Sequence, residues 1–305
     1  MNEQIAPGPI ARRVLESVRR QMRTKVADLG AFRASREYAA ALQKTVTPRE
    51  QLAETHPAHA IYIHSQNQMS VMAEQLLQLP DMKSFLKQIG AAEDEYMPSW
   101  PPMSPISRSF FVCWSTYDLP VGARRESVGT VTIAVARECG TDPKLLALMQ
   151  RLQESRMGIY QVERQDGVQV RLRDLATDQA CEAICQSGYC GSAGELWYAR
   201  VLPPPAPGAH HVVLTSPYVL IAPDLADWTA YLDRVAAKTP GTSRENVLEH
   251  HFKWGETARY WPEFVFEAYS NHSAGAIFLH GLPDMPETRP HSRKYRPPGL
   301  CLENR

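Results

Sequence analysis

The sequence has no long hydrophobic run and no excess of either charge. Its longest apolar stretches, such as residues 128–136, end within about ten residues, short of the ~18 to 20 that a membrane-spanning helix needs. Lysine plus arginine and aspartate plus glutamate number 33 each, so no overall field draws the chain to nucleic acid or to an anionic membrane. We therefore expect no membrane insertion, and binding to nucleic acid would require a local basic segment.

Cysteine is also scarce, and the first residues contain no apolar run followed by a small-residue cleavage site. The six cysteines are irregularly spaced in 305 residues, which favours free thiols over a disulfide framework. Without a secretory signal, we expect a cytoplasmic location. A hydrophobic content of 44% with 22% charged residues is typical of a folded chain and excludes general disorder. The length exceeds that of one compact core, which favours two domains or one extended domain.

The first third of the chain has the periodicity of helices. Apolar residues recur at three- and four-residue spacing from Val14 to Leu29, which predicts a helix that ends at Gly30. Further helices are predicted at 35–44, after Thr47-Pro48, and at 58–79 and 81–89. We assign residues 1–97 to a mainly helical region. Four prolines between residues 93 and 105 then indicate a linker or an ordered loop.

The middle of the chain is predicted to be rich in strands. The runs 110–114 and 127–135 are β-branched and aromatic, and a helix is predicted from Asp142-Pro143, so residues 98–165 are an α/β segment. Alternating apolar residues after a turn at Gly167 predict a hairpin. Further strands are predicted at 196–202, 211–214 and 218–221. Residues 166–223 therefore form a small antiparallel β module.

The last part of the chain returns to helical patterns. Asp224 is a helix cap, Thr242-x-x-Glu245 is a capping-box pattern, and a third helix is predicted to begin at Pro262. We assign 224–279 to a helical C-terminal region and 280–305 to a basic, proline-rich tail. The fold class predicted for the whole chain is α+β, with a small barrel-like antiparallel sheet between two helical regions.

One part of the β module is similar to a known group of sequences. The segments Val-Gln-Val-Arg-Leu-Arg-Asp-Leu-Ala-Thr (168–177), Gly-Glu-Leu-Trp-Tyr-Ala-Arg-Val-Leu-Pro (194–203) and Leu-Ile-Ala-Pro (220–223) carry the similarity. They resemble a β module of functionally uncharacterised bacterial proteins, some of which also carry a cysteine-rich SEC-C zinc motif. The resemblance covers about a fifth of the chain and implies a small barrel-like module without catalytic residues. The zinc ligands of those proteins are missing here, because Cys301 stands alone near the end.

Three cysteines form the densest group of residues with chemical potential. Cys181, Cys185 and Cys190 could ligate zinc if His210 or His211 completed the set, but their spacing matches no standard zinc site. Cys190 could instead act as a nucleophile, with His210 and Asp174 as partners to test. The alternative for all three is a structural thiol, which is the commoner role of cysteine. We assign no metal and no cofactor.

Two further groups suggest binding rather than catalysis. Four arginines of the first helix could contact phosphates, or could form an ordinary solvated face: Arg12, Arg13, Arg19 and Arg20. Four aromatic residues near the C-terminus could bind a protein partner, or could fill a core: Trp254, Tyr260, Trp261 and Phe264. The histidines at 56, 59 and 64 fit no single helical stripe and are predicted to lie in a loop and an early helix.

These observations order three functional hypotheses. The first is a non-enzymatic protein-interaction or regulatory module, because no catalytic constellation is visible while basic and aromatic residues are locally concentrated. The second is association with nucleic acid through the basic first helix. The third is an enzyme of unrecognised type with a cysteine nucleophile.

Overall fold

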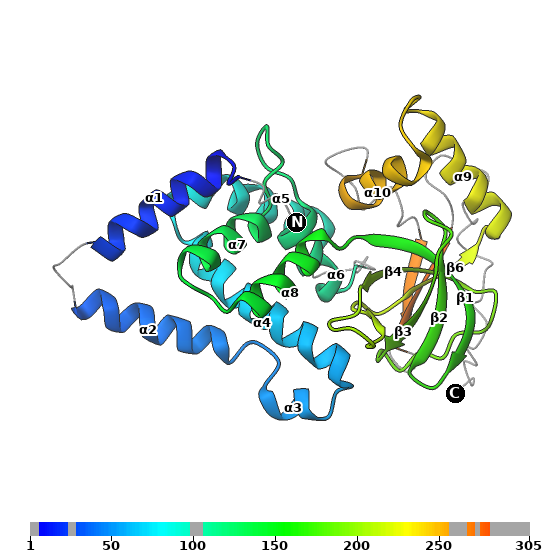
Figure 1. Cartoon of the computed structure of the whole chain (residues 1–305), viewed down its shortest axis with the longest axis horizontal. Coiled ribbons are helices and arrows are strands. Elements are labelled where there is room, and N and C mark those ends of the chain that lie inside the picture. The colour runs from blue at the N-terminus through cyan, green and yellow to red at the C-terminus, as the bar shows by residue number, and fades with distance from the viewer. Residues whose placement is uncertain (1–5, 24–28, 98–105, 256–266, 272–274, 281–305) are drawn as a thin grey trace, which may run out of the picture.

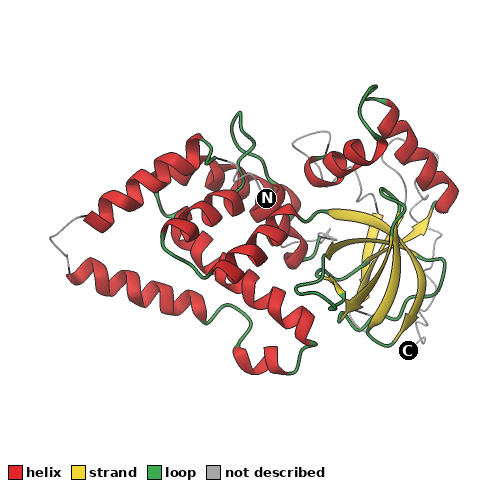
Figure 2. Ribbon diagram, viewed as in Figure 1, coloured by secondary structure: helices red, strands yellow, loops and turns green. Residues whose placement is uncertain are grey.

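The computed structural model describes residues 6–23, 29–97, 106–255, 267–271 and 275–280. Helices make up the first half of the chain and a β-barrel follows them, with a second group of helices beside the barrel (Figures 1 and 2). The predicted α+β class is therefore confirmed. No helix within the described residues combines the length and apolar composition that crossing a bilayer would require.

The N-terminal region is helical, as predicted, and α4 lies at its centre. Its elements are α1 (Pro9–Arg23), α2 (Leu29–Gln43), α3 (Arg49–Ala53), α4 (Pro57–Leu77), the 3₁₀ turn η1 (Pro80–Met82) and α5 (Lys83–Tyr96). α4 contacts α2, α3, α5, α7 and α8. The prediction that one helix runs from Val14 to Gly30 is wrong: α1 ends at Arg23, and Gly30 lies in the first turn of α2. The helical spacing of apolar residues continues in the sequence through Val26 and Leu29, so this pattern did not indicate that α1 ends at Arg23.

The two strands predicted before the β module are helices. The segment forms α6 (Arg108–Cys113), the π-helical turn η2 (Trp114–Asp118), α7 (Val128–Glu138) and α8 (Pro143–Glu154). Ser127 and Thr130 form a capping box that starts α7, and Ser107 caps α6. α7 is buried on almost every side, so its β-branched residues satisfy tertiary packing rather than strand propensity.

The β module is a closed five-stranded barrel. Its strands are β1 (Met157–Asp166), β2 (Gln169–Asp174), β3 (Ala180–Cys185), β4 (Leu196–Leu202) and β5 (His211–Val213). They pair in the order β1-β2-β3-β5-β4-β1; the β3–β5 pairing is parallel and the others are antiparallel. β1 pairs with β4 through its first half and with β2 through its second half, and its register with β2 shifts between Val162 and Arg164. The predicted hairpin at Gly167 and the strands at 196–202 and 211–214 are thus confirmed.

The C-terminal part adds two helices and three strands to the barrel. β6 (Tyr218–Ala222) pairs with β4, and β8 (Ala276–His280) joins β6 to β7 (Glu267–Asn271). α9 (Leu225–Ala237) is capped by Asp224 as predicted, whereas the cap of α10 (Arg244–Trp254) is Ser243 rather than Thr242. The helix predicted from Pro262 is wrong over its last residues, which form β7; its first residues lie outside the described part of the chain. The proposed tail, 281–305, also lies outside it.

Apolar side chains inside and outside the barrel hold the parts together. Tyr160, Val162, Leu172 and Trp197 are among the residues that fill the interior. The outer side of β1, β4, β6 and β8 packs against α6, α9 and α10 in a second cluster. Two further clusters join α4, α7 and α8 to β4 and β5, and α1 to α5 and α7.

A buried ion cluster lies where the helical region, the barrel and α10 meet. Asp118 of η2 accepts hydrogen bonds from Arg200 of β4 and, at 2.7 Å, from Lys253 of α10. Asp118 and Arg200 are each 1% exposed. Lys253 Nζ also donates to the carbonyls of Gln153 (2.5 Å) and Ser155 (2.7 Å), and Arg200 donates to Ser155 (2.8 Å). One carboxylate therefore binds cations from two other parts of the fold, and backbone carbonyls accept their remaining hydrogen bonds.

Removing that carboxylate should strongly destabilise the fold. We expect Asp118→Ala to lower the free energy of unfolding by about 3–5 kcal/mol, because two buried cations lose their counter-charge. Urea denaturation followed by circular dichroism measures the change. The matched control is Asp94→Ala on the exposed surface of α5, which should stay within about 0.5 kcal/mol of wild type. Equal stability of the two variants would contradict the role given to Asp118.

Candidate functional site

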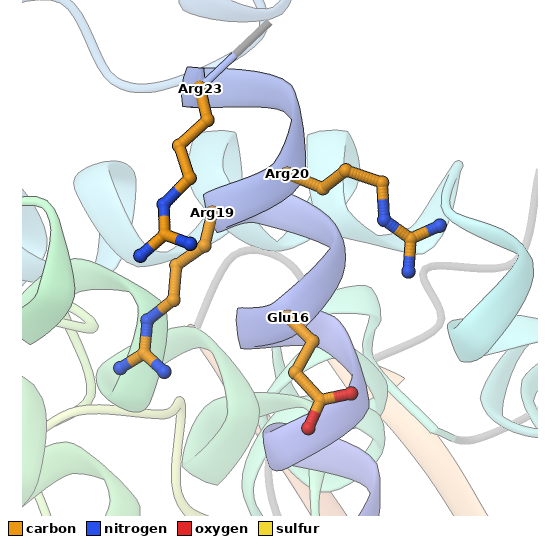
Figure 3. Close-up of a pocket in the computed structure, with 4 residues that line it drawn as sticks. All are labelled: Glu16, Arg19, Arg20 and Arg23. Atoms are coloured by element: carbon orange, nitrogen blue, oxygen red, sulfur yellow. The ribbon is translucent and has the colours of Figure 1, made fainter.

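The arginines of α1 gather on one face of the helix. Its opposite face is buried through Ile10, Ala11, Val14 and Leu15. At about 100° per residue, all five arginines and Glu16 fall within an arc of about 120° on the solvent side. These arginines are Arg12, Arg13, Arg19, Arg20 and Arg23, and we call this surface the α1 arginine face. Arg19 and Arg23 extend to one side of α1 and Arg20 to the other, and together with Glu16 they line an open pocket on this surface (Figure 3).

The start of α1 is fixed by an acid far away in the sequence. The carboxylate of Glu126 accepts hydrogen bonds from the backbone N–H groups of Ile10 (2.9 Å) and Ala11 (2.8 Å). A negative charge there also interacts favourably with the helix dipole. Gly8 leaves room for it, since a Cβ at that position would lie 2.3 Å from Glu126 Cδ. The α1 arginine face is therefore held in a defined orientation.

Two of the four arginines predicted to bind nucleic acid are held by carboxylates of the same chain. Arg19 donates two hydrogen bonds to Glu138 of α7, at 2.7 and 2.8 Å, and this pairing raises the pKa of Arg19 and lowers that of Glu138. Arg13 lies 3.6 Å from Asp81. Within the described residues, no carboxylate pairs with Arg12 or Arg23. Only part of the positive charge is therefore available to a partner.

The second half of α1 extends beyond the core. Its buried residues all precede Glu16, and Gln21, Met22 and Arg23 are exposed. The side chain of Met22 is 67% exposed, and Tyr38 on α2 is 40% exposed. The end of α1 and the start of α2 lie at the end of the molecule farthest from the barrel (Figure 1). At about 100° per residue, Met22 lies on the side of Leu15, outside the arc of the arginines, so exposed apolar surface lies beside the α1 arginine face and not within it.

The three candidate zinc ligands do not converge. Cys181 and Cys185 lie four residues apart on β3, and a strand rise of about 3.3 Å per residue separates them by roughly 13 Å. Burial raises the pKa of both thiols, that of Cys181 to about 11. Cys190 is exposed in the loop that follows. No group of three or more His, Cys, Asp or Glu residues suited to a metal ion occurs among the described residues.

The proposed catalytic residues are also separated. Asp174 ends β2 near the start of β3, where its carboxylate is bound to Arg156 at 2.8 Å. His210 precedes β5, which pairs with the end of β3, and Cys190 follows that end. The length of β3, roughly 15 Å, therefore separates Asp174 from Cys190, while His210 is level with the middle of β3 because His211 pairs with Ala183. The structure does not assemble this trio.

Only one of the four aromatic residues predicted to bind a partner can be placed. Trp254 ends α10 and is half-buried, with Lys253 Nζ 5.5 Å from the centre of its ring. Tyr260, Trp261 and Phe264 lie outside the described residues. Sequence reasoning missed Glu126 and Glu138, which orient the α1 arginine face. No local pattern could have identified them, because each is more than 100 residues from its partner.

Thiol accessibility tests the assignment of the cysteines. We expect iodoacetamide to label Cys139 and Cys190 at similar rates in the native protein, because both are exposed. Cys113 and Cys185 should react at least about a hundredfold more slowly, since both are buried and reaction requires opening of the core. Burial also raises the pKa of Cys113 to about 11. Peptide mass spectrometry after timed labelling gives each rate, and a denatured sample is the control. Labelling of Cys190 far ahead of Cys139 at pH 6 would instead indicate an activated nucleophile.

Comparison with protein-family models, with curated proteins and with solved structures finds no match to this chain.

Proposed function

We propose that this protein is a non-enzymatic binding module whose α1 arginine face contacts an acidic surface of another protein. The observation that carries the proposal is the concentration of five arginines on one side of a helix whose other side is packed and whose start is fixed by Glu126. A rigid, pre-positioned charged surface loses little conformational entropy on binding. Met22 adds an exposed apolar residue near the end of this surface.

The composition of the face favours a protein over a nucleic acid. Glu16 lies within the arc and would repel a phosphate backbone, whereas it can pair with a cation of a protein partner. Arg13 and Arg19 already contact carboxylates. Arginine beside exposed methionine is typical of protein–protein contact surfaces, while nucleic-acid binding depends on the number of phosphates neutralised.

The barrel supplies no second basic surface. Five-stranded barrels that bind oligonucleotides use the outer face of their second and third strands. Here, Arg171 on β2 pairs with Glu163 (2.6 Å) and Glu182 (2.9 Å), and Arg173 also pairs with Glu163. Arg164 pairs with Glu182 at 3.0 Å. The charges on this face are balanced, which further supports a protein partner.

Binding to model polyanions provides the first test. We expect labelled poly-glutamate to bind, and the double variant Arg12→Glu/Arg23→Glu to reduce affinity about tenfold, because each exposed ion pair contributes up to ~1 kcal/mol. Fluorescence anisotropy at several salt concentrations measures the affinity. The matched control is Arg33→Glu/Arg36→Glu on the exposed surface of α2, which should retain most of the binding.

A single-stranded oligonucleotide serves as the competing ligand in the same assay. If it bound more tightly than poly-glutamate at matched charge, and lost affinity in the α1 variant alone, the partner would be a nucleic acid.

A photoreactive residue at Met22, beside the α1 arginine face, identifies the contact in cell extract, with the exposed Val168 of the β1–β2 turn as control position. Equal capture from the two positions would reject the α1 arginine face as the contact surface.

A further inference from the structure

A second feature, independent of the α1 arginine face, lies where the start of α4 meets the barrel. The side chain of Gln186, just after β3, contacts two histidines of the helical region. Its Oε1 accepts a hydrogen bond from the backbone N–H of His56 (3.2 Å) and lies 2.8 Å from His59 Nδ1. The N–H of His56 requires the oxygen of the amide, not its NH₂ group, to face α4. We call these residues, with His210, the histidine joint.

This geometry fixes the proton on His59. Because the Gln186 oxygen can only accept, His59 Nδ1 must carry the hydrogen, and the neutral ring has its lone pair on Nε2. That Nε2 atom is buried and has no hydrogen-bond partner among the described residues. A second proton would therefore place a buried N–H and a positive charge where no acceptor is available. Burial lowers the pKa of His59 accordingly, with a further contribution from His56.

Other imidazoles surround the same joint. The rings of His56 and His210 meet edge to face at 6.4 Å, and His56 Nδ1 accepts from the N–H of Ala58 at the start of α4. Burial also lowers the pKa of His211, with His210 adding to the effect. Several imidazole rings therefore lie close together at this junction.

The remaining charged groups around the joint do not compensate a positive charge on His59. On the side of α8, Arg151 donates a hydrogen bond to the carbonyl oxygen of Pro204 at 2.5 Å. The hydroxyl of Tyr62 on α4 donates to the carbonyl oxygen of Pro203 at 2.6 Å, and burial raises the pKa of this hydroxyl although Arg151 acts to lower it. Glu54, before α4, is exposed. On β3, the side chain of Glu182 is already bound by Arg164 and Arg171. No free carboxylate among these groups is placed to neutralise a protonated His59.

We propose that the histidine joint is a proton-sensitive connection: uptake of a proton by His59 at mildly acidic pH loosens the start of α4 from the barrel. The folded-state pKa lies below the ordinary value of about 6.5, so the unfolded or loosened state binds the proton more readily. The contribution of neutral His59 to the stability of the joint is complete above pH 6.5. It is lost as the pH falls from 6.5 through the lower pKa of His59 in the folded state. The hydrogen bonds of Tyr62 and Arg151 to the carbonyls of Pro203 and Pro204 remain and limit the change to the joint.

Hydrogen exchange detected by mass spectrometry tests the proposal on the full-length protein. After correction for intrinsic exchange rates, we expect amides at the start of α4 and in residues 203–211 to exchange roughly three- to tenfold faster at pH 5.5 than at pH 7.5. Uptake of one proton can change the opening equilibrium by at most about tenfold per pH unit, which sets this range. His59→Gln keeps an N–H donor for Gln186 but cannot titrate. It should remove most of the difference. His64→Gln, an exposed position on the same helix, should leave it unchanged.

A second variant reverses the expected sign and does not depend on His59→Gln folding normally. Gln186→Glu places a carboxylate against His59 Nδ1, so protonation should now tighten the joint, and exchange at the start of α4 should slow at pH 5.5. The same pH response in wild type, His59→Gln and Gln186→Glu would overturn the proposal. An exchange rate in wild type that does not change between the two pH values would also overturn it.

Discussion

The contacts of Asp118 with Arg200 and Lys253 hold the three parts of this molecule in one arrangement. Burying ions is unfavourable unless their hydrogen-bonding capacity is met, and here one carboxylate faces two cations. The balance is supplied by the end of α8, whose last carbonyls, from Gln153 and Ser155, accept from Lys253. The C-terminal end of a helix carries partial negative charge and so stabilises the ammonium group. Burial lowers the pKa of Lys253 to about 8, and the amine still stays mainly protonated at neutral pH.

A second ion cluster has the same arrangement at another boundary. Arg156, just before β1, is bound by Asp174 of β2 at 2.8 Å and by Glu249 of α10 at 2.5 Å, and its guanidinium lies 5.3 Å from the ring centre of Phe252. Gly158 permits this arrangement, because a Cβ there would lie 2.4 Å from the arginine. Apolar clusters thus fill the parts and join them, while the ion clusters fix the relative orientation of the parts at two of their boundaries.

The sequence predicted the features that depend on neighbouring residues. The hairpin at Gly167 and the caps of α8 and α9 have local signals, and all were confirmed. The strand predicted at 127–135 failed because β-branched residues favour strands on average, whereas burial around α7 and the cap at Ser127 favour a helix. The ion clusters and the histidine joint could not be predicted, since their members lie up to 154 residues apart, the separation of His56 and His210. The arginines of α1 were visible in the sequence, but the acids that pair with them were not.

The two proposals are connected through α4. This helix of 21 residues, about 31 Å long, contacts the barrel through His56 and His59 at its start. Near its end, Ala73 and Leu76 belong to the apolar cluster that holds α1. The contacts that orient the α1 arginine face, from Glu126, Glu138 and Asp81, all lie within the helical region. Tyr62 and Arg151 keep their contacts with Pro203 and Pro204 when the histidine joint loosens, so the change leaves both the composition and the orientation of that face as they are. Partner binding by α1 and the proton response at the start of α4 are therefore separable properties of the two ends of one helix.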